Sequence, residues 1–211
     1  MYLMLSKRNW NANKAVLFDL DGVLVDACDW HYEALNKALK EVSNTWINRD
    51  EHVSDFNGLS TLTKLKMLVD QGRVKEEDIS TISSLKQKYT IQTIEDNTTV
   101  DETKVMLCNK LKANGYKVAC VTNCIRHTAE LMLKACGVHE HMDLIVSNED
   151  SLNNKPHPEP YIKAMVILGC LPENCTIIED SPTGLEAARL SGASVVKVRN
   201  ATEVIPEMIK L

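Results

Sequence analysis

The sequence predicts an α/β fold, with a doubly wound parallel sheet as a Rossmann-like core and an inserted all-helical cap domain. Three observations lead to this prediction. Short apolar runs of β-forming residues alternate with helical patterns along most of the chain. Proline near the start and glycine beyond the end delimit several of those helices. One long stretch after the first apolar run carries helical spacing alone.

The apolar runs come first, because they define the sheet. Each is nearly continuous, which is typical of parallel strands that are covered on both faces. The expected strands are residues 15–20, 116–123, 143–148, 175–180 and 194–198. The helices expected between them are residues 101–113, 126–135, 159–168 and 182–190. This order of strand and helix favours an open sheet with helices on both faces.

Residues 29–95 interrupt the alternation with three helical patterns, and Ser60 is a plausible N-cap for the second. We therefore expect an α/β core of residues 1–28 and 96–211 and a helical cap of residues 29–95. An insert at this point is well placed to cover a site at the carboxyl ends of the strands. Lysines 64, 66, 86 and 88 are spaced like solvated helix faces, with the alternative that one of them reaches a substrate from the cap. Methionines 106, 132 and 165 are spaced like core residues.

Composition excludes several classes of protein. The 211 residues carry 24 Lys and Arg against 29 Asp and Glu, so no basic field is present to hold a nucleic acid. Apolar runs are too short to span a membrane, and the N-terminus lacks the pattern of a secretory leader. The seven cysteines form no C-x-x-C pair, which favours structural thiols in a cytoplasmic protein over a zinc ribbon.

Acidic residues follow the first expected strand. Asp19 and Asp21 are two residues apart, so side chains that alternate along a strand point the same way. Two like charges this close are costly unless a cation or a proton relieves them. A Mg²⁺ site with a nucleophilic carboxylate fits this pattern. A solvated acidic turn is the alternative.

Three further groups of polar residues lie at the carboxyl ends of other expected strands. Thr122 and Asn123 follow the second strand, Lys155 follows the third, and Glu179 and Asp180 end the fourth. A hydroxyl, an amide, a lysine and two more acids thus join Asp19 at the edge where open α/β sheets bind ligands. This convergence favours the metal and phosphate site over the acidic turn.

At this point the sequence resembles a known family. The stretches DLDGVLVD, VTN, KPHPEPY and IIEDSPTG resemble the four motifs of the haloacid dehalogenase superfamily. The helical insert resembles the cap of its subfamily I, and the intervals between motifs are similar to those of β-phosphoglucomutase-like phosphatases. The resemblance implies Mg²⁺-dependent hydrolysis of a small phosphate monoester through an aspartyl-phosphate intermediate.

The same resemblance implies a role for each site residue. Asp19 is expected as the nucleophile and Asp21 as the general acid and base. Mg²⁺ is expected on Asp19, on Asp21 through its backbone carbonyl and on Asp180, with Glu179 as a ligand or a neighbouring partner. The phosphoryl group is expected on Thr122, Asn123 and Lys155.

Substrate choice is expected to depend on the cap. His31, at the junction of core and cap, and Gly58 and Thr61, in a cap loop, are the candidate contacts. Mutases of this family carry an arginine where this chain has Thr61, so a hydrolase is favoured over a sugar-phosphate mutase. A non-catalytic phosphate-binding protein and a phospho-accepting receiver domain are further alternatives. The expected partner is a small phosphorylated metabolite, and a monomer suffices because the cap belongs to the same chain.

Overall fold

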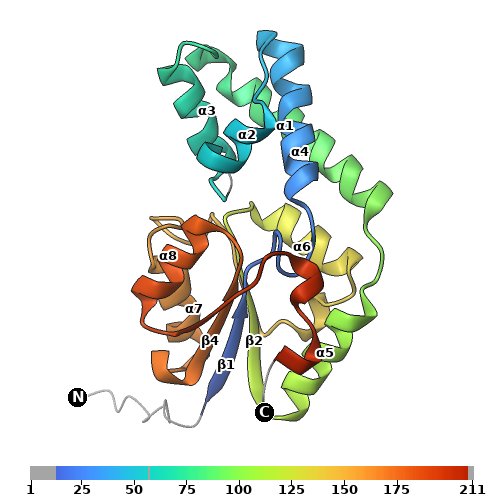
Figure 1. The fold of residues 1–211 in the computed structure, drawn as a ribbon, viewed down its shortest axis with the longest axis vertical. Helices are drawn as coiled ribbons and strands as arrows, with labels where there is room; N and C mark the ends of the chain where they lie inside the picture. Colours follow the sequence, from blue (N-terminus) through green and yellow to red (C-terminus); the bar gives the residue numbers. More distant parts are fainter. Residues whose placement is uncertain (1–12, 57, 209–211) are drawn as a thin grey trace, which may run out of the picture.

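The computed structural model describes residues 13–56 and 58–208 (Figure 1). The strands are β1 Lys14–Phe18, β2 Tyr116–Val121, β3 Leu144–Val146, β4 Cys175–Glu179 and β5 Ser194–Lys197. All their pairings are parallel, in the order β3-β2-β1-β4-β5. Strand β1 lies in the centre and the chain winds outward on both sides, which confirms the doubly wound sheet.

The strands end earlier than the apolar runs predict. Strand β1 ends at Phe18 rather than at residue 20, and β2 at Val121 rather than at residue 123. The apolar pattern continues because the chain stays buried after it leaves the sheet, and Leu20 is fully buried. Asp19, Thr122 and Asp180 consequently stand just beyond the ends of their strands, whereas Glu179 is the last paired residue of β4.

Four helices cover the two faces of the sheet: α5 Glu102–Ala113, α6 Arg126–Ala135, α7 Glu159–Leu168 and α8 Pro182–Ser191. Alternate residues of β1 divide between the faces, since Val16 and Phe18 pack with α5 and α6 while Ala15 and Leu17 pack with α7 and α8. Met132 and Met165 lie in these cores as expected. Met106 is 62% exposed, so that prediction was wrong. It lies off the buried face of α5, which Leu107 and Leu111 occupy.

The insert is helical, as predicted. It contains α1 Cys28–Ser43, α2 Arg49–Glu51, a π-helical turn His52–Phe56, α3 Thr61–Asp70 and α4 Ile79–Asn97. Helices α1 and α4 pack along each other, and a separate apolar core that includes Leu35, Leu39 and Ile82 holds the insert together. Figure 1 shows these helices as a unit above the sheet. The division of the chain at residues 28 and 96 stays a prediction.

Two local expectations also have an outcome. The Ser60 hydroxyl accepts a hydrogen bond from the Thr63 backbone N–H at 3.2 Å, so Ser60 caps α3. Across the two described ranges, none of the helices combines the length and the apolarity that a bilayer crossing requires. The expectation about an N-terminal leader concerns residues 1–12, which lie outside the described part of the chain.

Candidate active site

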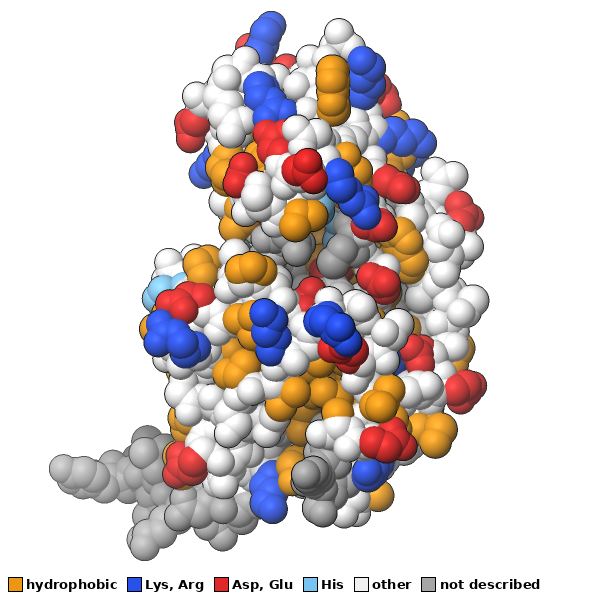
Figure 2. Space-filling model, viewed as in Figure 1, with side chains coloured by type: hydrophobic (Ala, Val, Ile, Leu, Met, Phe, Trp, Pro, Cys, Tyr) orange, Lys and Arg blue, Asp and Glu red, His pale blue; other side chains and the backbone are white. Residues whose placement is uncertain are grey.

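The carboxyl ends of β1, β2 and β4 open into a cleft of about 560 Å³ below the cap. Figure 2 shows the surface hollowed between the cap and the core. Nine of the ten site residues proposed from the sequence line this cleft: Asp19, Asp21, His31, Gly58, Thr61, Thr122, Asn123, Lys155 and Asp180. The tenth, Glu179, lies fully buried directly beneath them. Residues from six separate segments therefore meet at one place.

The first group at this site is here named the buried cluster, and it consists of Asp19, Lys155, Glu179 and Asp180. Lys155 Nζ lies 2.6 Å from Asp19 Oδ1 and 2.6 Å from Glu179 Oε1. Its side chain is only 3% exposed. Hydrogen bonds between charged groups are strong when they are shielded from water, so Lys155 fixes the position of the Asp19 carboxylate.

Glu179 supports the loop that follows β4. Its Oε1 atom also accepts a hydrogen bond from the Tyr161 hydroxyl at 2.8 Å. Its Oε2 atom accepts hydrogen bonds from the backbone N–H groups of Asp180 and Ser181 and from the Ser181 hydroxyl. Ser181 in turn caps α8 by accepting from the Gly184 N–H at 3.1 Å. Both oxygens of Glu179 are thus engaged within the protein, and its direct binding of a metal stays a prediction.

The pKa values in the buried cluster indicate an excess of negative charge. Burial, followed by repulsion from Glu179, raises the pKa of Asp19 well above its usual value, against the opposing effect of Lys155. Burial and Glu179 also raise the pKa of Asp180 to about 7. A bound cation would relieve both carboxylates.

The donor set fits Mg²⁺. Asp19, Glu179 and Asp180 each offer a carboxylate oxygen, and these atoms lie within 4.8 Å of one another. Asp180 Oδ1 is buried and has no hydrogen-bond partner, which is costly unless another group binds it. Hard oxygen ligands are those that Mg²⁺ prefers. Asp19 and Asp180 are therefore the side chains best placed to hold the ion.

The residues after β2 shape the part of the cleft expected to hold phosphate. Thr122 is 1% exposed, and its hydroxyl accepts a hydrogen bond from the Cys124 N–H at 3.0 Å. Asn123 donates to the carbonyls of Gly58 and Lys155, at 2.9 and 3.1 Å, and accepts from the Lys155 N–H. Asn123 thereby joins the core to the cap loop and positions Lys155. Its contact with phosphate stays a prediction.

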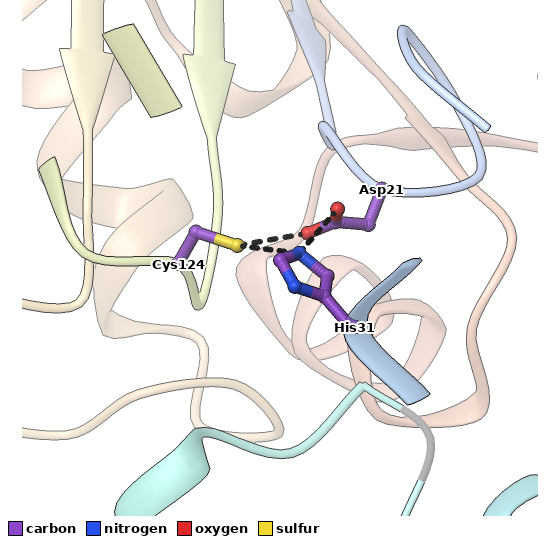
Figure 3. A group of neighbouring side chains, drawn as sticks. All are labelled: Asp21, His31 and Cys124. Carbon is purple, nitrogen blue, oxygen red and sulfur yellow. Dashed lines mark hydrogen bonds and ion pairs between the residues drawn. The ribbon is translucent and has the colours of Figure 1, made fainter. Parts of the chain in front are cut away.

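A second group lies on the cap side of the cleft, here named the cap-side cluster: Asp21, His31, Cys124 and Lys86. His31 Nε2 lies 2.9 Å from Asp21 Oδ1, and Cys124 Sγ donates to Asp21 Oδ2 at 3.0 Å (Figure 3). Lys86 Nζ lies 3.0 Å from His31 Nδ1. Burial alone would raise the pKa of Asp21, but His31 and Cys124 stabilise its charged form and lower the pKa to about 2.

Three residues that line the cleft, Lys64, Lys86 and Cys124, correct the sequence analysis. Lys64 and Lys86 are buried rather than solvated, and both line the cleft. The signal was present in α4, where residues 82, 86, 90 and 94 form a stripe at a spacing of four that is entirely buried. Cys124 is also more than a structural thiol, since it contacts Asp21. Its position directly after Thr122 and Asn123, at a strand end, could have indicated this.

The comparison with protein families decides the identity of the chain. The sequence model of the haloacid dehalogenase-like hydrolases matches residues 16–198. The chain belongs to this family. The four motifs that suggested the haloacid dehalogenase superfamily lie within the matched region, and the expectation of a hydrolase with the subfamily I architecture is confirmed.

Relatives and solved structures agree with this membership. Pyrophosphatase PpaX of Bacillus cereus (strain AH820) is 31% identical over 186 residues, which cover 87% of this chain and 82% of the relative. A β-phosphoglucomutase from Clostridium difficile superposes with a TM-score of 0.80 at 25% identity and covers 94% of both chains. A protein described as a predicted phosphoglycolate phosphatase, from Haemophilus somnus 129pt, superposes with a TM-score of 0.76 at 22% identity over 90% of this chain and 86% of its own, and supports the fold alone. The chain is thus a haloacid dehalogenase-like hydrolase with a phosphatase-type architecture.

Proposed function

We propose that this protein hydrolyses a small phosphate monoester with Mg²⁺, through an aspartyl-phosphate on Asp19. The observation that carries the proposal is the geometry of Asp19. Its carboxylate lies at the central strand, opens into the cleft and is held by Lys155 at 2.6 Å. A carboxylate so fixed is a competent nucleophile toward phosphorus.

In the first half of the reaction, Asp19 attacks the phosphorus atom and the alcohol leaves. Lys155 and Thr122 border the space beside Asp19 and would bind the phosphoryl oxygens. Mg²⁺, held by Asp19 and Asp180, would supply the positive charge that phosphoryl transfer requires. Preorganised charge of this kind provides most of the catalysis in such reactions.

Asp21 serves both halves of the reaction in this proposal. It protonates the leaving oxygen and then removes a proton from the water that attacks the aspartyl-phosphate. With a pKa of about 2, Asp21 is ionised and suited to the second step. For the first step it must carry a proton, so its contacts with His31 and Cys124 must loosen when substrate enters. Movement of the cap, which carries His31, would achieve this and would exclude water.

The cap wall of the cleft supports a substrate with a second anionic group. Thr61 brings no charge to the cleft. Lys64, one helical turn further along α3, and Lys86, on α4, both line the cleft and bring positive charge to it. Pyrophosphate and phosphoglycolate, the compounds named in the descriptions of two similar proteins, both carry a second anionic group.

A sugar-phosphate mutase is the second candidate. The 25% identity to a β-phosphoglucomutase favours it, and Lys64 could hold the second phosphate in place of the arginine that Thr61 replaces. A non-catalytic phosphate-binding protein has less support, because it needs neither Asp19 nor Asp21.

The test compares the wild type with Asp19→Asn and Asp21→Asn in the presence of Mg²⁺. Phosphate release from p-nitrophenyl phosphate should fall by about 10⁴-fold or more in Asp19→Asn. In Asp21→Asn it should fall about 10²- to 10⁴-fold. Because p-nitrophenolate leaves without a proton, Asp21→Asn should still be phosphorylated and should accumulate acyl phosphate, detectable by intact mass.

A panel of phosphate compounds, in which pyrophosphate is an anhydride and the others are monoesters, then separates the candidates. Pyrophosphate, phosphoglycolate and sugar phosphates are compared, and β-glucose 1-phosphate with trace 1,6-bisphosphate is tested for isomerisation. Isomerisation without net phosphate release would show that the protein is a mutase and would contradict the proposed hydrolase function. Full activity of Asp19→Asn on any substrate would exclude the aspartyl-phosphate mechanism.

A further inference from the structure

The cap-side cluster brings together three kinds of metal-binding atom. The Sγ of Cys124 lies 3.0 Å from Asp21 Oδ2 and 3.4 Å from His31 Nε2, and that nitrogen lies 2.9 Å from Asp21 Oδ1. One sulfur, one nitrogen and one carboxylate group, whose two oxygens each make one of these contacts, thus approach a common point (Figure 3). They come from three segments: the loop after β1, the loop after β2 and the start of α1.

This donor set differs from that of the buried cluster. Among the residues that the structure describes, two groups of three such side chains lie close enough to share an ion. Asp19, Glu179 and Asp180 offer oxygen alone, which suits Mg²⁺. A thiolate and an imidazole beside a carboxylate suit a borderline-soft cation, of which Zn²⁺ is the common example.

The spacing also fits a tetrahedral ion. Bonds of about 2.3 Å to sulfur and about 2.0 Å to nitrogen or oxygen place tetrahedral ligands about 3.3–3.5 Å apart. The Sγ–Nε2 distance of 3.4 Å already has this length. The 2.9 and 3.0 Å contacts go to different oxygens of Asp21, so the carboxylate must turn for one oxygen, which lies within 4.8 Å of both other atoms, to serve as the third ligand. Three protein ligands leave the fourth position for water.

We propose that Asp21, His31 and Cys124 form an inhibitory Zn²⁺ site, separate from the Mg²⁺ site. Zinc there occupies the carboxylate that the reaction needs as its acid and base. It also ties His31 of the cap to Asp21 and Cys124 of the core, which opposes movement of the cap. The inhibitory effect rests on the proposed function, but the binding of zinc does not.

The protons balance as follows. Binding displaces the proton from the Cys124 thiol, which becomes a thiolate ligand. The Nε2 atom of His31 must bind the ion without a proton, so Nδ1 must carry one. Lys86 Nζ lies 3.0 Å from Nδ1 and donates a hydrogen bond to it before zinc binds. On binding, Lys86 passes this proton to Nδ1 and, as a neutral amine, accepts the hydrogen bond from the new Nδ1–H. One proton leaves from Cys124 and one from the His31–Lys86 pair, so each Zn²⁺ bound releases two protons to solvent.

Cobalt provides a direct test of binding, because Co²⁺ replaces Zn²⁺ in such sites and a thiolate ligand gives a charge-transfer absorption band. The wild type titrated with Co²⁺ in the presence of Mg²⁺ should develop this band, and Zn²⁺ should abolish it. Cys124→Ser should lack the band, and His31→Gln should bind about 100-fold more weakly or worse. The matched control is Cys170→Ser, a buried cysteine on the opposite face of the sheet, which should keep the band.

Calorimetry and kinetics complete the test. Zn²⁺ binding, measured in two buffers of different protonation enthalpy, should release two protons in the wild type. With Mg²⁺ saturating, the zinc concentration that halves each enzyme's own zinc-free rate should rise about 100-fold in Cys124→Ser. The urea unfolding curve of Cys124→Ser verifies that the variant is folded.

The outcomes separate the two proposals. Equal zinc affinity in the wild type and Cys124→Ser, or an unchanged cobalt band, would overturn the site. A band that depends on Cys124 without inhibition by zinc would overturn the inhibitory role. If no phosphate ester is turned over at all, the proposed function fails while the cobalt titration still decides the site.

Discussion

Asp19 and Asp21 are separated by one residue, yet the protein places them in opposite surroundings. Asp19 faces two further carboxylates and is held by the ammonium group of Lys155. Asp21 instead accepts hydrogen bonds from an imidazole and a thiol. The pKa of Asp19 is raised, chiefly by burial, whereas that of Asp21 is lowered to about 2 against the effect of burial.

The difference shows how one strand end places two carboxylates in different chemical environments. A carboxylate among other carboxylates depends on cations, so the charge and the position of Asp19 follow Lys155 and would follow a metal ion if one were bound. A carboxylate among hydrogen-bond donors keeps its charge without a metal and exchanges protons with its neighbours. Environments that give two neighbouring acids different pKa values are the usual basis for assigning distinct roles to them.

The largest expected effect comes from replacing the lysine of each cluster and comparing the two losses in the free energy of unfolding. Lys155→Met leaves Asp19 and Glu179 facing each other in a buried site, so the free energy of unfolding should fall by about 3–5 kcal/mol. Lys86→Met leaves Asp21 with both of its donors, so the loss should be about 1 kcal/mol. Urea unfolding without Mg²⁺ measures both, and equal losses would refute the contrast.

An effect of intermediate size tests whether His52, which lines the cleft from the cap, makes the stability of the fold depend on pH. Burial, with Lys64 and Arg49, lowers the pKa of His52 to about 4. Between about pH 6.5 and pH 4 the unfolded chain binds a proton at this position and the folded chain does not, so stability falls as the pH falls. We expect a loss of about 2 kcal/mol across this window, because each pKa unit corresponds to about 1.4 kcal/mol and residual solvent screens part of it.

The measurement is chemical unfolding at a series of pH values. His52→Gln should flatten the dependence, whereas His127→Gln, at an exposed histidine of α6, should leave the slope unchanged. Identical slopes in the wild type and His52→Gln would show that the acid sensitivity arises elsewhere.

The smallest effect concerns the support beneath the buried cluster. An added Cβ at Gly184 would lie 1.8 Å from Glu179 Oε1, and Glu179 cannot turn away because Lys155 and Tyr161 hold it. Alanine should gain about 1 kcal/mol in a helix, but overpacking typically costs 1–3 kcal/mol. We expect Gly184→Ala to lose about 1 kcal/mol net in thermal or urea unfolding. A gain in stability would mean that Glu179 is less rigidly held than the hydrogen bonds indicate.

Much of the fold and of the buried cluster follows from local sequence pattern. Apolar runs specify the strands, and the residues just beyond them, such as Asp19, Thr122 and Asp180, must gather at one edge because all the strands are parallel. The boundaries were less predictable. An apolar run predicts which residues are buried and does not predict where the strand ends. Leu20 is buried although it lies outside the sheet.

The cap-side cluster could not be predicted in the same way. Lys86 reaches His31 only because α4 packs along α1, and helix packing of this kind leaves little trace in a single sequence. Cys124 resembled a structural thiol until the loop after β1 placed Asp21 beside it. Asn123 shows a related limit, since its amide binds backbone carbonyls that are distant in sequence.

The central position of β1 has a consequence for synthesis of the protein. Phe18 pairs with Cys120 on one side and Ile178 on the other, so the first strand made has partners that emerge much later. During translation the cap helices, whose contacts are mostly among themselves, can fold while the strand that bears Asp19 still lacks both neighbours. The strand that precedes Asp19 therefore acquires its second neighbour only after β4 has left the ribosome.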